Sequence, residues 1–216
     1  MNIVLFGATG NIGRRIAQEA MRRGHRVQGV VRDPSAAQAP DDRVQLVSGD
    51  ATDADSVAQA VRGADAVVST ISPRPNARGL PVPRLVDNVR ALIAGLRRAG
   101  VDRVLYVGGA GSLEVAPGQA LVDQPGFPEA YEAEAREGRD ALDVWRREAE
   151  GLAWTYLSPA AEIAAGERTG RYRTTRDRVL RDAEGNSFIT YEDYAVAVLD
   201  ELEKPQHVGE RFGVAY

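Results

Sequence analysis

The stretch Gly7-Ala8-Thr9-Gly10-Asn11-Ile12-Gly13 decides the fold of this 216-residue chain. It follows a short apolar run at residues 2–6, typical of a buried parallel strand, and precedes apolar residues at helical spacing that stop at Gly24. Three glycines so placed allow a tight turn, close approach of backbone to a pyrophosphate, and close packing of helix on strand. The free N–H groups and the dipole at the helix N-terminus favour a negative charge there. The stretch therefore predicts a dinucleotide-binding strand–loop–helix unit, with an ordinary tight turn as the alternative.

The rest of the chain continues the alternation of strands and helices. Strands are predicted at residues 27–31, 44–47, 65–70, 103–107 and 154–157, and short strands at 171–174, 187–189 and 211–214. The clearest helix has apolar residues at helical spacing from 85 to 96 and stops at Gly100, and another is predicted at about 191–203. Such alternation means right-handed crossovers and a parallel sheet that is covered on both faces.

We therefore predict an α/β fold, a Rossmann doubly wound parallel sheet with a small C-terminal substrate region. Residues 1–216 are expected to form a single NAD(P)-binding domain, to which residues 159–190 contribute a small cap on the substrate side. Loops are expected over the prolines Pro73, Pro75, Pro81 and Pro83 and over residues 108–128, the latter followed by a helix to about residue 150.

Composition excludes several classes of function. With no cysteine, the chain has no disulfide, zinc-thiolate site or cysteine nucleophile. The formal net charge of −4 argues against a general nucleic-acid binder, and no apolar run is long enough to span a membrane. Asp50, Asp53 and Asp55 look superficially like a metal cluster, but helix capping explains them and we expect no metal. We expect a cytoplasmic protein that acts on a small molecule, either as a monomer or as a homodimer.

The end of the second strand, Val30-Val31-Arg32-Asp33-Pro34, indicates which dinucleotide binds. NAD-binding proteins tend to carry an acidic residue here, which bonds the ribose hydroxyls. In this chain Arg32 comes first, and a guanidinium can bind a 2′-phosphate through two hydrogen bonds. Asp33 precedes a proline and is expected to shape the turn. NADP(H) is therefore favoured over NAD(H), with a merely solvated Arg32 as the alternative.

Further cofactor contacts are expected where parallel strands end, because doubly wound sheets bind ligands at that edge. Asp50 and Ala51 are expected near the adenine, and Thr70 and Ile71 along the ribose and diphosphate; a loop or capping role is the alternative for Asp50. Ser158, Pro159 and Ala160 are expected beside the nicotinamide. The complete set of predicted cofactor-binding residues is Gly7, Thr9, Gly10, Asn11, Ile12, Gly13, Arg32, Asp50, Ala51, Thr70, Ile71, Gly108, Ser158, Pro159 and Ala160.

Two residues are candidates for catalysis. Ser112 closes the glycine-rich segment that starts at Gly108, where a backbone without side chains could approach a flat ring, and its hydroxyl could donate a proton or hydrogen bond. Tyr131 lies on the helix expected after the fifth strand and could contact the substrate. Loop capping by Ser112 and helix packing by Tyr131 are the alternatives. Arg168 and Arg171 could bind a phosphate-bearing substrate, although surface solvation is the favoured explanation for each.

Several segments resemble one known family. They are the glycine stretch, Val31-Arg32-Asp33-Pro34, Tyr156-Leu157-Ser158-Pro159-Ala160, Gly166-Glu167-Arg168-Thr169-Gly170, and the tail with Ser187-Phe188-Ile189 and Tyr191-Glu192-Asp193-Tyr194-Ala195. Together they look like the atypical short-chain dehydrogenase/reductases, in particular the NADH-flavin reductase group, related to NmrA-like and biliverdin-reductase-B-like proteins. The resemblance spans the whole chain and implies a seven- or eight-stranded Rossmann sheet, NADP(H), and a flavin or similar planar acceptor as substrate.

The chain departs from orthodox short-chain dehydrogenases in one respect. Those enzymes use a tyrosine with a lysine four residues later, which lowers the pKa of the tyrosine. The single lysine here is Lys204, and Tyr131 is followed at that offset by Ala135. This argues against alcohol dehydrogenation and sugar epimerisation, but hydride transfer to a flavin depends mainly on stacking geometry.

The sequence therefore leaves three functions open. The first is an NAD(P)H-dependent oxidoreductase, specifically an NADPH-dependent reductase that transfers hydride to a flavin or similar acceptor. The second is a non-catalytic NADP(H)-binding redox sensor of the NmrA-like kind. The third is a ketoreductase or isomerase in a biosynthetic pathway.

Overall fold

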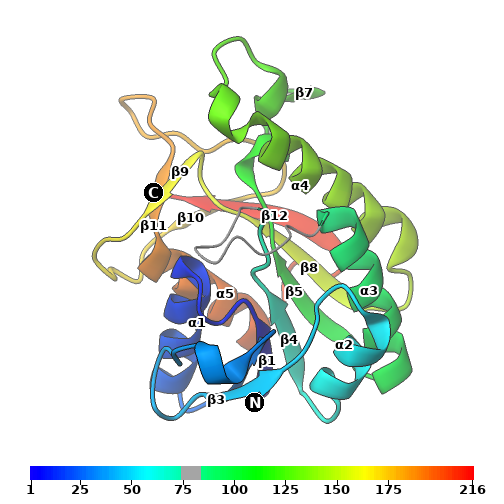
Figure 1. Cartoon of the computed structure of the whole chain (residues 1–216). Coiled ribbons are helices and arrows are strands. Elements are labelled where there is room, and N and C mark those ends of the chain that lie inside the picture. The colour runs from blue at the N-terminus through cyan, green and yellow to red at the C-terminus, as the bar shows by residue number, and fades with distance from the viewer. Residues whose placement is uncertain (74–83) are drawn as a thin grey trace.

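A twisted eight-stranded sheet forms the centre of the molecule (Figure 1). The computed structural model describes residues 1–73 and 84–216. The strand order is β10-β12-β8-β5-β4-β1-β2-β3, and each neighbouring pair is parallel except β10 with β12. The strands are β1 (Asn2–Phe6), β2 (Arg26–Val31), β3 (Gln45–Ser48), β4 (Ala66–Ser69), β5 (Arg103–Val107), β8 (Ala153–Ser158), β10 (Arg173–Thr175) and β12 (Glu210–Ala215). The predicted Rossmann fold is confirmed.

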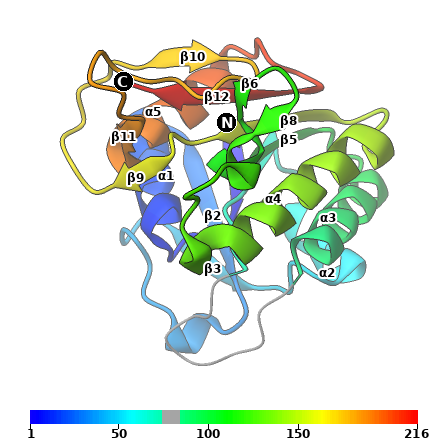
Figure 2. The same ribbon diagram turned by 90° about the horizontal axis from the view of Figure 1, so that it is seen from above.

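Helices cover both faces of this sheet (Figure 2). Helices α1 (Asn11–Arg22) and α5 (Tyr191–Glu203) pack on one face, and α2 (Ala54–Val61), α3 (Leu85–Ala99) and α4 (Glu129–Glu148) pack on the other. Because β1 lies between β2 and β4, the chain winds outward in both directions from β1. The ends of β1 and β4 therefore flank the switch point at which doubly wound folds bind ligands.

The core on the α2–α4 side is built around stacked aromatic rings. The ring of Tyr106 lies 5.6 Å from that of Tyr156 and 5.7 Å from that of Trp145, measured between centroids. All three side chains are almost completely buried. Such ring pairs contribute about 0.5–1.5 kcal/mol beyond the burial of their area, so they hold α4 firmly against β5 and β8.

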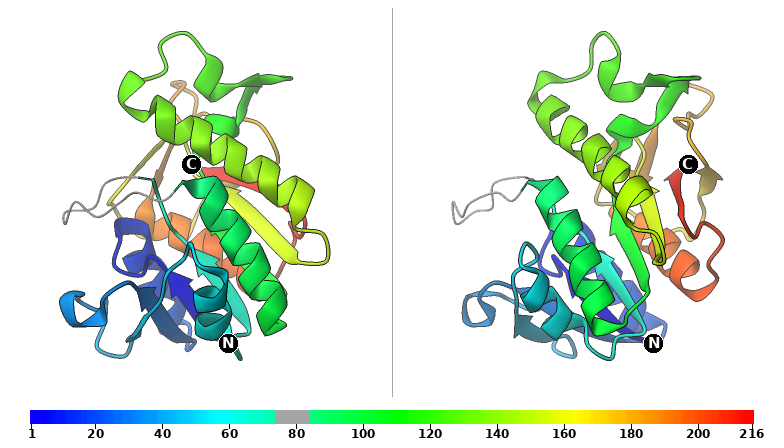
Figure 3. Two further views of the ribbon diagram at one scale, coloured as in Figure 1. Left: turned by 45° about the vertical axis from the view of Figure 1, so that its right-hand side comes forward. Right: turned by 90° about the vertical axis from the view of Figure 1, so that its right-hand side faces the viewer.

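The structure differs from the sequence prediction mainly between β5 and α4. The loop expected over residues 108–128 contains two 3-10 turns, Ala110–Ser112 and Leu121–Asp123, and a small hairpin of β6 (Glu114–Ala116) and β7 (Gln119–Ala120). In Figure 3 the chain from this hairpin forms a projection beyond the first turn of α4.

Two further differences concern the C-terminal part and the proline-rich segment. A short strand that the sequence did not predict, β9 (Glu162–Ala164), pairs with β11 (Phe188–Thr190) in parallel. The expected strand at residues 171–174 is shifted and runs from Arg173 to Thr175. Most of the proline-rich loop, with Pro75, Pro81 and Pro83, lies outside the described residues.

Candidate cofactor and substrate site

The glycine stretch forms a tight turn between β1 and α1. Gly7 has a φ of +82°, in the left-handed region, and the N–H of Gly10 donates to the Gly7 carbonyl at 3.0 Å. A Cβ on Gly13 would lie 2.1 Å from that same carbonyl oxygen, so only glycine lets α1 approach β1 this closely. No side chain caps α1 at Gly10, and the first N–H groups of a helix have no acceptor within it. The turn therefore presents free donors of the kind that hold a dinucleotide pyrophosphate.

Thr70, at the end of β4, is brought against this turn. Its N–H donates to the Phe6 carbonyl at 3.0 Å, and its hydroxyl lies 3.1 Å from that oxygen and 3.2 Å from the Gly7 carbonyl oxygen. A Cβ on Gly7 would come within 2.3 Å of the Thr70 hydroxyl oxygen. Ile71 packs partly buried against the α2–α3 core. The predicted pair Thr70 and Ile71 thus lies beside the glycine turn, and Thr70 directs its hydroxyl to the turn backbone.

The ends of β2 and β3 bring Arg32 and Asp50 close together. Two hydrogen bonds from Thr52, one from the hydroxyl at 2.6 Å and one from the N–H at 2.8 Å, lower the pKa of Asp50, and the positive charge of Arg32 lowers it further. The Ala51 carbonyl accepts from the amide of Asn88 at 2.7 Å. Asp50 thus accepts hydrogen bonds within its own turn, as the alternative predicted, and its contact with the adenine remains a prediction. Arg32 is exposed beside it.

The turn-shaping role predicted for Asp33 is confirmed. Its carboxylate accepts from the N–H of Ser35 at 3.0 Å and from the hydroxyl of Ser35 at 2.6 Å, and it caps the 3-10 turn Pro34–Ala36. Arg32 is thus presented on a fixed turn. Within the described residues no three acidic or histidine side chains are grouped to hold a metal.

Gly108 leaves room for a ring of the protein itself. A Cβ at this position would lie 1.9 Å from the ring of Tyr156. The Tyr156 hydroxyl accepts from the N–H of Gly109 at 3.2 Å and donates to the Gly138 carbonyl in α4 at 2.9 Å. Burial raises the pKa of Tyr156 to about 12, so this hydroxyl stays protonated and joins the β5 loop to α4. Sequence analysis missed this role because it assigned the open space at Gly108 to a ligand.

Ser158, Pro159 and Ala160 are all buried at the end of β8. The hydroxyl of Ser158 has no hydrogen-bond partner among the described residues, and neither has that of Ser69 at the end of β4. A buried hydroxyl without a partner costs about 1–3 kcal/mol. Both side chains are completely buried by the protein itself, so neither hydroxyl faces an open ligand site. The predicted contact of Ser158, Pro159 and Ala160 with the nicotinamide therefore remains a prediction.

The two catalytic candidates lie near the two ends of the β5–α4 connection, Ser112 in the 3-10 turn after β5 and Tyr131 at the start of α4. Ser112 is half-buried, and its hydroxyl oxygen accepts from the guanidinium of Arg211 in β12 at 3.3 Å. Tyr131 lies in the first turn of α4 with 52% of its surface exposed. Their catalytic roles remain predictions.

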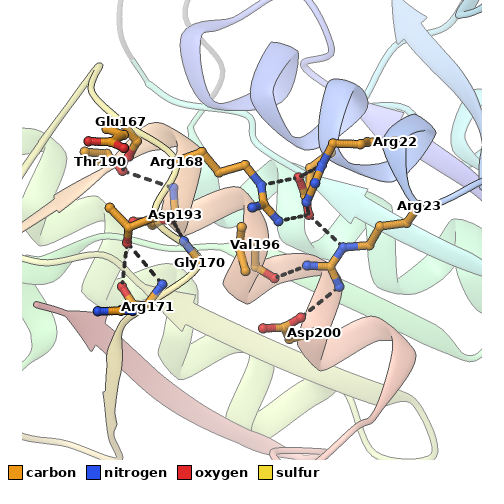
Figure 4. A network of polar contacts seen from close by, with 12 residues as sticks. Arg22, Arg23, Glu167, Arg168, Gly170, Arg171, Thr190, Asp193, Val196 and Asp200 are labelled. Carbon is orange, nitrogen blue, oxygen red and sulfur yellow. Dashed lines mark hydrogen bonds and ion pairs between the residues drawn. The ribbon is translucent and has the colours of Figure 1, made fainter.

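The segment 165–170 lies along α1 and α5 (Figure 4). Arg168 makes two hydrogen bonds, of 2.9 and 3.0 Å, to the carboxylate of Glu19, which is 4% exposed on α1. Asp193 of α5 accepts from the Thr169 hydroxyl at 2.6 Å and from the Gly170 N–H at 2.7 Å. Arg168 therefore fastens this segment to the helical layer, and neither solvation nor phosphate binding accounts for it.

A cavity of about 620 Å³ lies at the opposite edge of the sheet. Arg26, Arg43 and Arg62 are among its lining residues. The C-terminal ends of α1 and α2 point toward that edge, and helix C-termini carry partial negative charge. We therefore assign the cofactor to the glycine turn and not to this cavity.

Fold and site together define a nicotinamide-dinucleotide-binding oxidoreductase of the short-chain dehydrogenase/reductase type. The chain belongs to the NAD(P)H-binding family, whose model matches residues 7–205. It is 41% identical over 218 residues to the uncharacterized protein YwnB of Bacillus subtilis (strain 168), covering 99% of this chain and 98% of that protein.

Two solved structures extend the comparison. A "putative epimerase" from Bacteroides thetaiotaomicron is 38% identical, with a TM-score of 0.87 over 100% of this chain and 96% of that one. A "putative NADH-flavin reductase" from Streptococcus pneumoniae TIGR4 is 32% identical, with a TM-score of 0.85 over 100% and 99% of the two chains. In the part of the chain that the structure describes, no helix is long and apolar enough to cross a membrane.

Proposed function

We propose that this protein is an NADPH-dependent reductase that transfers hydride to a flavin or a similar planar acceptor. The observation that carries the proposal is the cradle at the ends of β1 and β4, where Gly13 allows close packing and Thr70 fixes the turn. The Streptococcus pneumoniae relative, named for flavin reduction, supports the acceptor class.

Arg32 supports the choice of NADPH. It is exposed at the end of β2, on the turn fixed by Asp33, and it lies close enough to Asp50 to lower the pKa of that carboxyl group. A guanidinium so placed matches a 2′-phosphate, which offers oxygens to two parallel N–H donors. An acidic residue alone at this place would favour the ribose hydroxyls of NAD instead.

The remaining residues bind and orient. The free N–H groups at the start of α1 hold the pyrophosphate, and Ser158 with Ala160 borders the nicotinamide. The bound dinucleotide supplies a hydride. Because the chain has no lysine four residues after any tyrosine, a proton has to come from another group, and Ser112 and Tyr131 are the candidates.

Anaerobic assays test the proposal. NADPH absorbance is followed with FMN, FAD, riboflavin and a quinone, and NADH is compared under the same conditions. Saturable oxidation of NADPH, slower with NADH, is the expected result. A failure of every acceptor to support turnover would refute the reductase assignment.

One observation favours a second candidate, an isomerase. The Bacteroides thetaiotaomicron relative carries the name of an epimerase. An isomerase would regenerate its cofactor in each cycle, so it would convert a sugar or ketone substrate without net loss of NADPH absorbance. Product analysis after incubation with such substrates distinguishes the two functions.

A further inference from the structure

Arg211 is a charged residue buried in the sheet. Its side chain, in β12, is 3% exposed, and the strand register places it beside Tyr156 of β8. Its Nε and Nη2 donate to one carboxylate oxygen of Asp177, at 3.1 and 2.5 Å. Its Nη1 donates to the hydroxyl oxygen of Ser112 at 3.3 Å. The guanidinium thus links a half-exposed carboxylate to the predicted catalytic serine.

This arrangement fixes the direction in which Ser112 can donate. A guanidinium has donors only, so the Ser112 oxygen is the acceptor in this contact and its own proton points elsewhere. Among the hydrogen bonds of the described residues the Ser112 hydroxyl donates to no acceptor, and the residue is half-buried in the 3-10 turn that follows β5. The neighbouring positive charge also favours any negative charge that develops on the oxygen.

Stability does not explain why an arginine is buried here. Replacing a buried ion pair by apolar residues of similar size is often neutral or stabilising, because desolvation offsets the attraction. Asp177 is 50% exposed on its side chain, so removal of Arg211 leaves that carboxylate in contact with water. The ion pair of Arg211 and Asp177 is therefore better explained by the hydrogen bond through which Arg211 orients the Ser112 hydroxyl.

We propose that Arg211 is a positioning residue that aims the Ser112 hydroxyl proton at the acceptor, and that Asp177 holds Arg211 in place. The inference rests on the proposed reductase function. In the reaction the acceptor gains a hydride from NADPH and a proton from Ser112. The Oγ–H bond of Ser112 breaks, and the oxygen regains a proton from water, so NADPH, acceptor and one proton give NADP⁺ and the two-electron-reduced acceptor.

The test compares Ser112→Ala, Arg211→Met and the double variant in anaerobic turnover with a quinone, because reduction of its carbonyl group takes up a proton as well as the hydride. Loss of a general acid lowers the rate by roughly 100-fold or more, and we expect Ser112→Ala to show such a fall in kcat. Arg211→Met should approach it, and the double variant should be no slower than Ser112→Ala because both act through one proton. Affinity for NADPH, measured by fluorescence titration, should stay unchanged in all three.

Two further readouts separate positioning from a structural effect. Lowering the pH should recover part of the rate of Arg211→Met, since a solvent acid can replace the misdirected serine, and Arg211→Lys should retain part of the activity. The matched control is Arg176→Met, since Arg176 is 74% exposed and pairs with Glu210 at 3.3 Å beside Asp177. The control should keep the kcat of the unmodified protein. If Arg211→Met does not fold, Asp177→Asn tests the same linkage from the exposed side.

Each outcome decides the matter. A wild-type kcat in Arg211→Met, or additive losses in the double variant, would overturn the positioning role while leaving the reductase function intact. Absence of turnover in the unmodified protein with every acceptor would instead refute the proposed function, and this inference with it.

Discussion

Substitution of Arg32 tests how the site chooses its cofactor. Arg32→Gln keeps the length and polarity of the side chain but removes its charge and its two parallel donors. Hydrogen bonds to charged groups contribute about 1.5–3 kcal/mol, and exposure to solvent places Arg32 at the lower end. A loss of about 1.5 kcal/mol corresponds to roughly tenfold weaker NADPH binding. NADH lacks the 2′-phosphate, so its dissociation constant should not change.

The assay is a fluorescence titration of each dinucleotide into the unmodified protein, Arg32→Gln and Arg62→Gln. Arg62 is a suitable control because it is also exposed but lies after α2, at the opposite edge of the sheet. The NADPH preference of the unmodified protein should also weaken at high salt, since exposed charges are screened. Equal weakening of NADPH and NADH in Arg32→Gln, or no change in either, would refute the reasoning.

Three other substitutions probe the turn, the β5 loop and the C-terminal segment. Gly13→Ala places a Cβ 2.1 Å from the Gly7 carbonyl oxygen, so α1 has to move. We expect the free energy of unfolding, measured with denaturant, to fall by about 1–3 kcal/mol, and NADPH binding to be lost in titration. Tyr156→Phe leaves the Gly109 N–H and the Gly138 carbonyl without their partner, which should lower the free energy of unfolding by about 1–3 kcal/mol. The control Tyr106→Phe loses only a 3.4 Å contact with Asn88 and should cost less in the same unfolding experiment. Burial raises the pKa of Asp193, but hydrogen bonds from its neighbours outweigh this and lower the pKa overall. The carboxylate therefore contributes fully to folding stability above about pH 4, and this contribution is lost as the pH falls below that value. Asp193→Asn should reduce this part of the loss of stability in acid, and an unchanged curve of stability against pH would contradict the reasoning.

Sequence alone predicted the parts of the fold that depend on local patterns. β5 and α5 were placed at the residues where the structure has them, and the helix stop at Gly100 was correct because that residue adopts a φ of +67°. These features are encoded within a few neighbouring residues, as apolar periodicity and a glycine at a helix end. The predicted glycine turn likewise depends on spacing within one short stretch.

Contacts between distant segments could not be predicted in the same way. The pair of Glu19 and Arg168 joins residues 149 apart, and nothing near Arg168 indicates a buried carboxylate as its partner. The available signal was Glu19 itself, an acidic residue placed among the apolar positions of α1. The hairpin of β6 and β7 has strands of three and two residues, too short to show a periodicity.

In the candidate site, too, the features set by local sequence patterns could be predicted and the contacts between distant segments could not. Its cofactor side follows the ends of parallel strands, and the structure does bring Thr70 to the glycine turn. The substrate side depends on which side chains fill the space near the β5 loop. There Tyr156 fills the opening at Gly108, and Arg211 reaches Ser112 from the last strand, neither of which is visible without the fold.

The most direct test of the reductase assignment is an anaerobic single-turnover experiment with NADPH deuterated at one or the other C4 position, with FMN as the acceptor. A dinucleotide held in one orientation by the glycine turn presents one face of the nicotinamide to the acceptor. We therefore expect oxidation to slow with one of the two deuterated forms and to keep its rate with the other. If hydride transfer is the rate-limiting step and both deuterated forms react as fast as undeuterated NADPH, direct hydride transfer at this site would be contradicted. A complete lack of NADPH oxidation would contradict it as well.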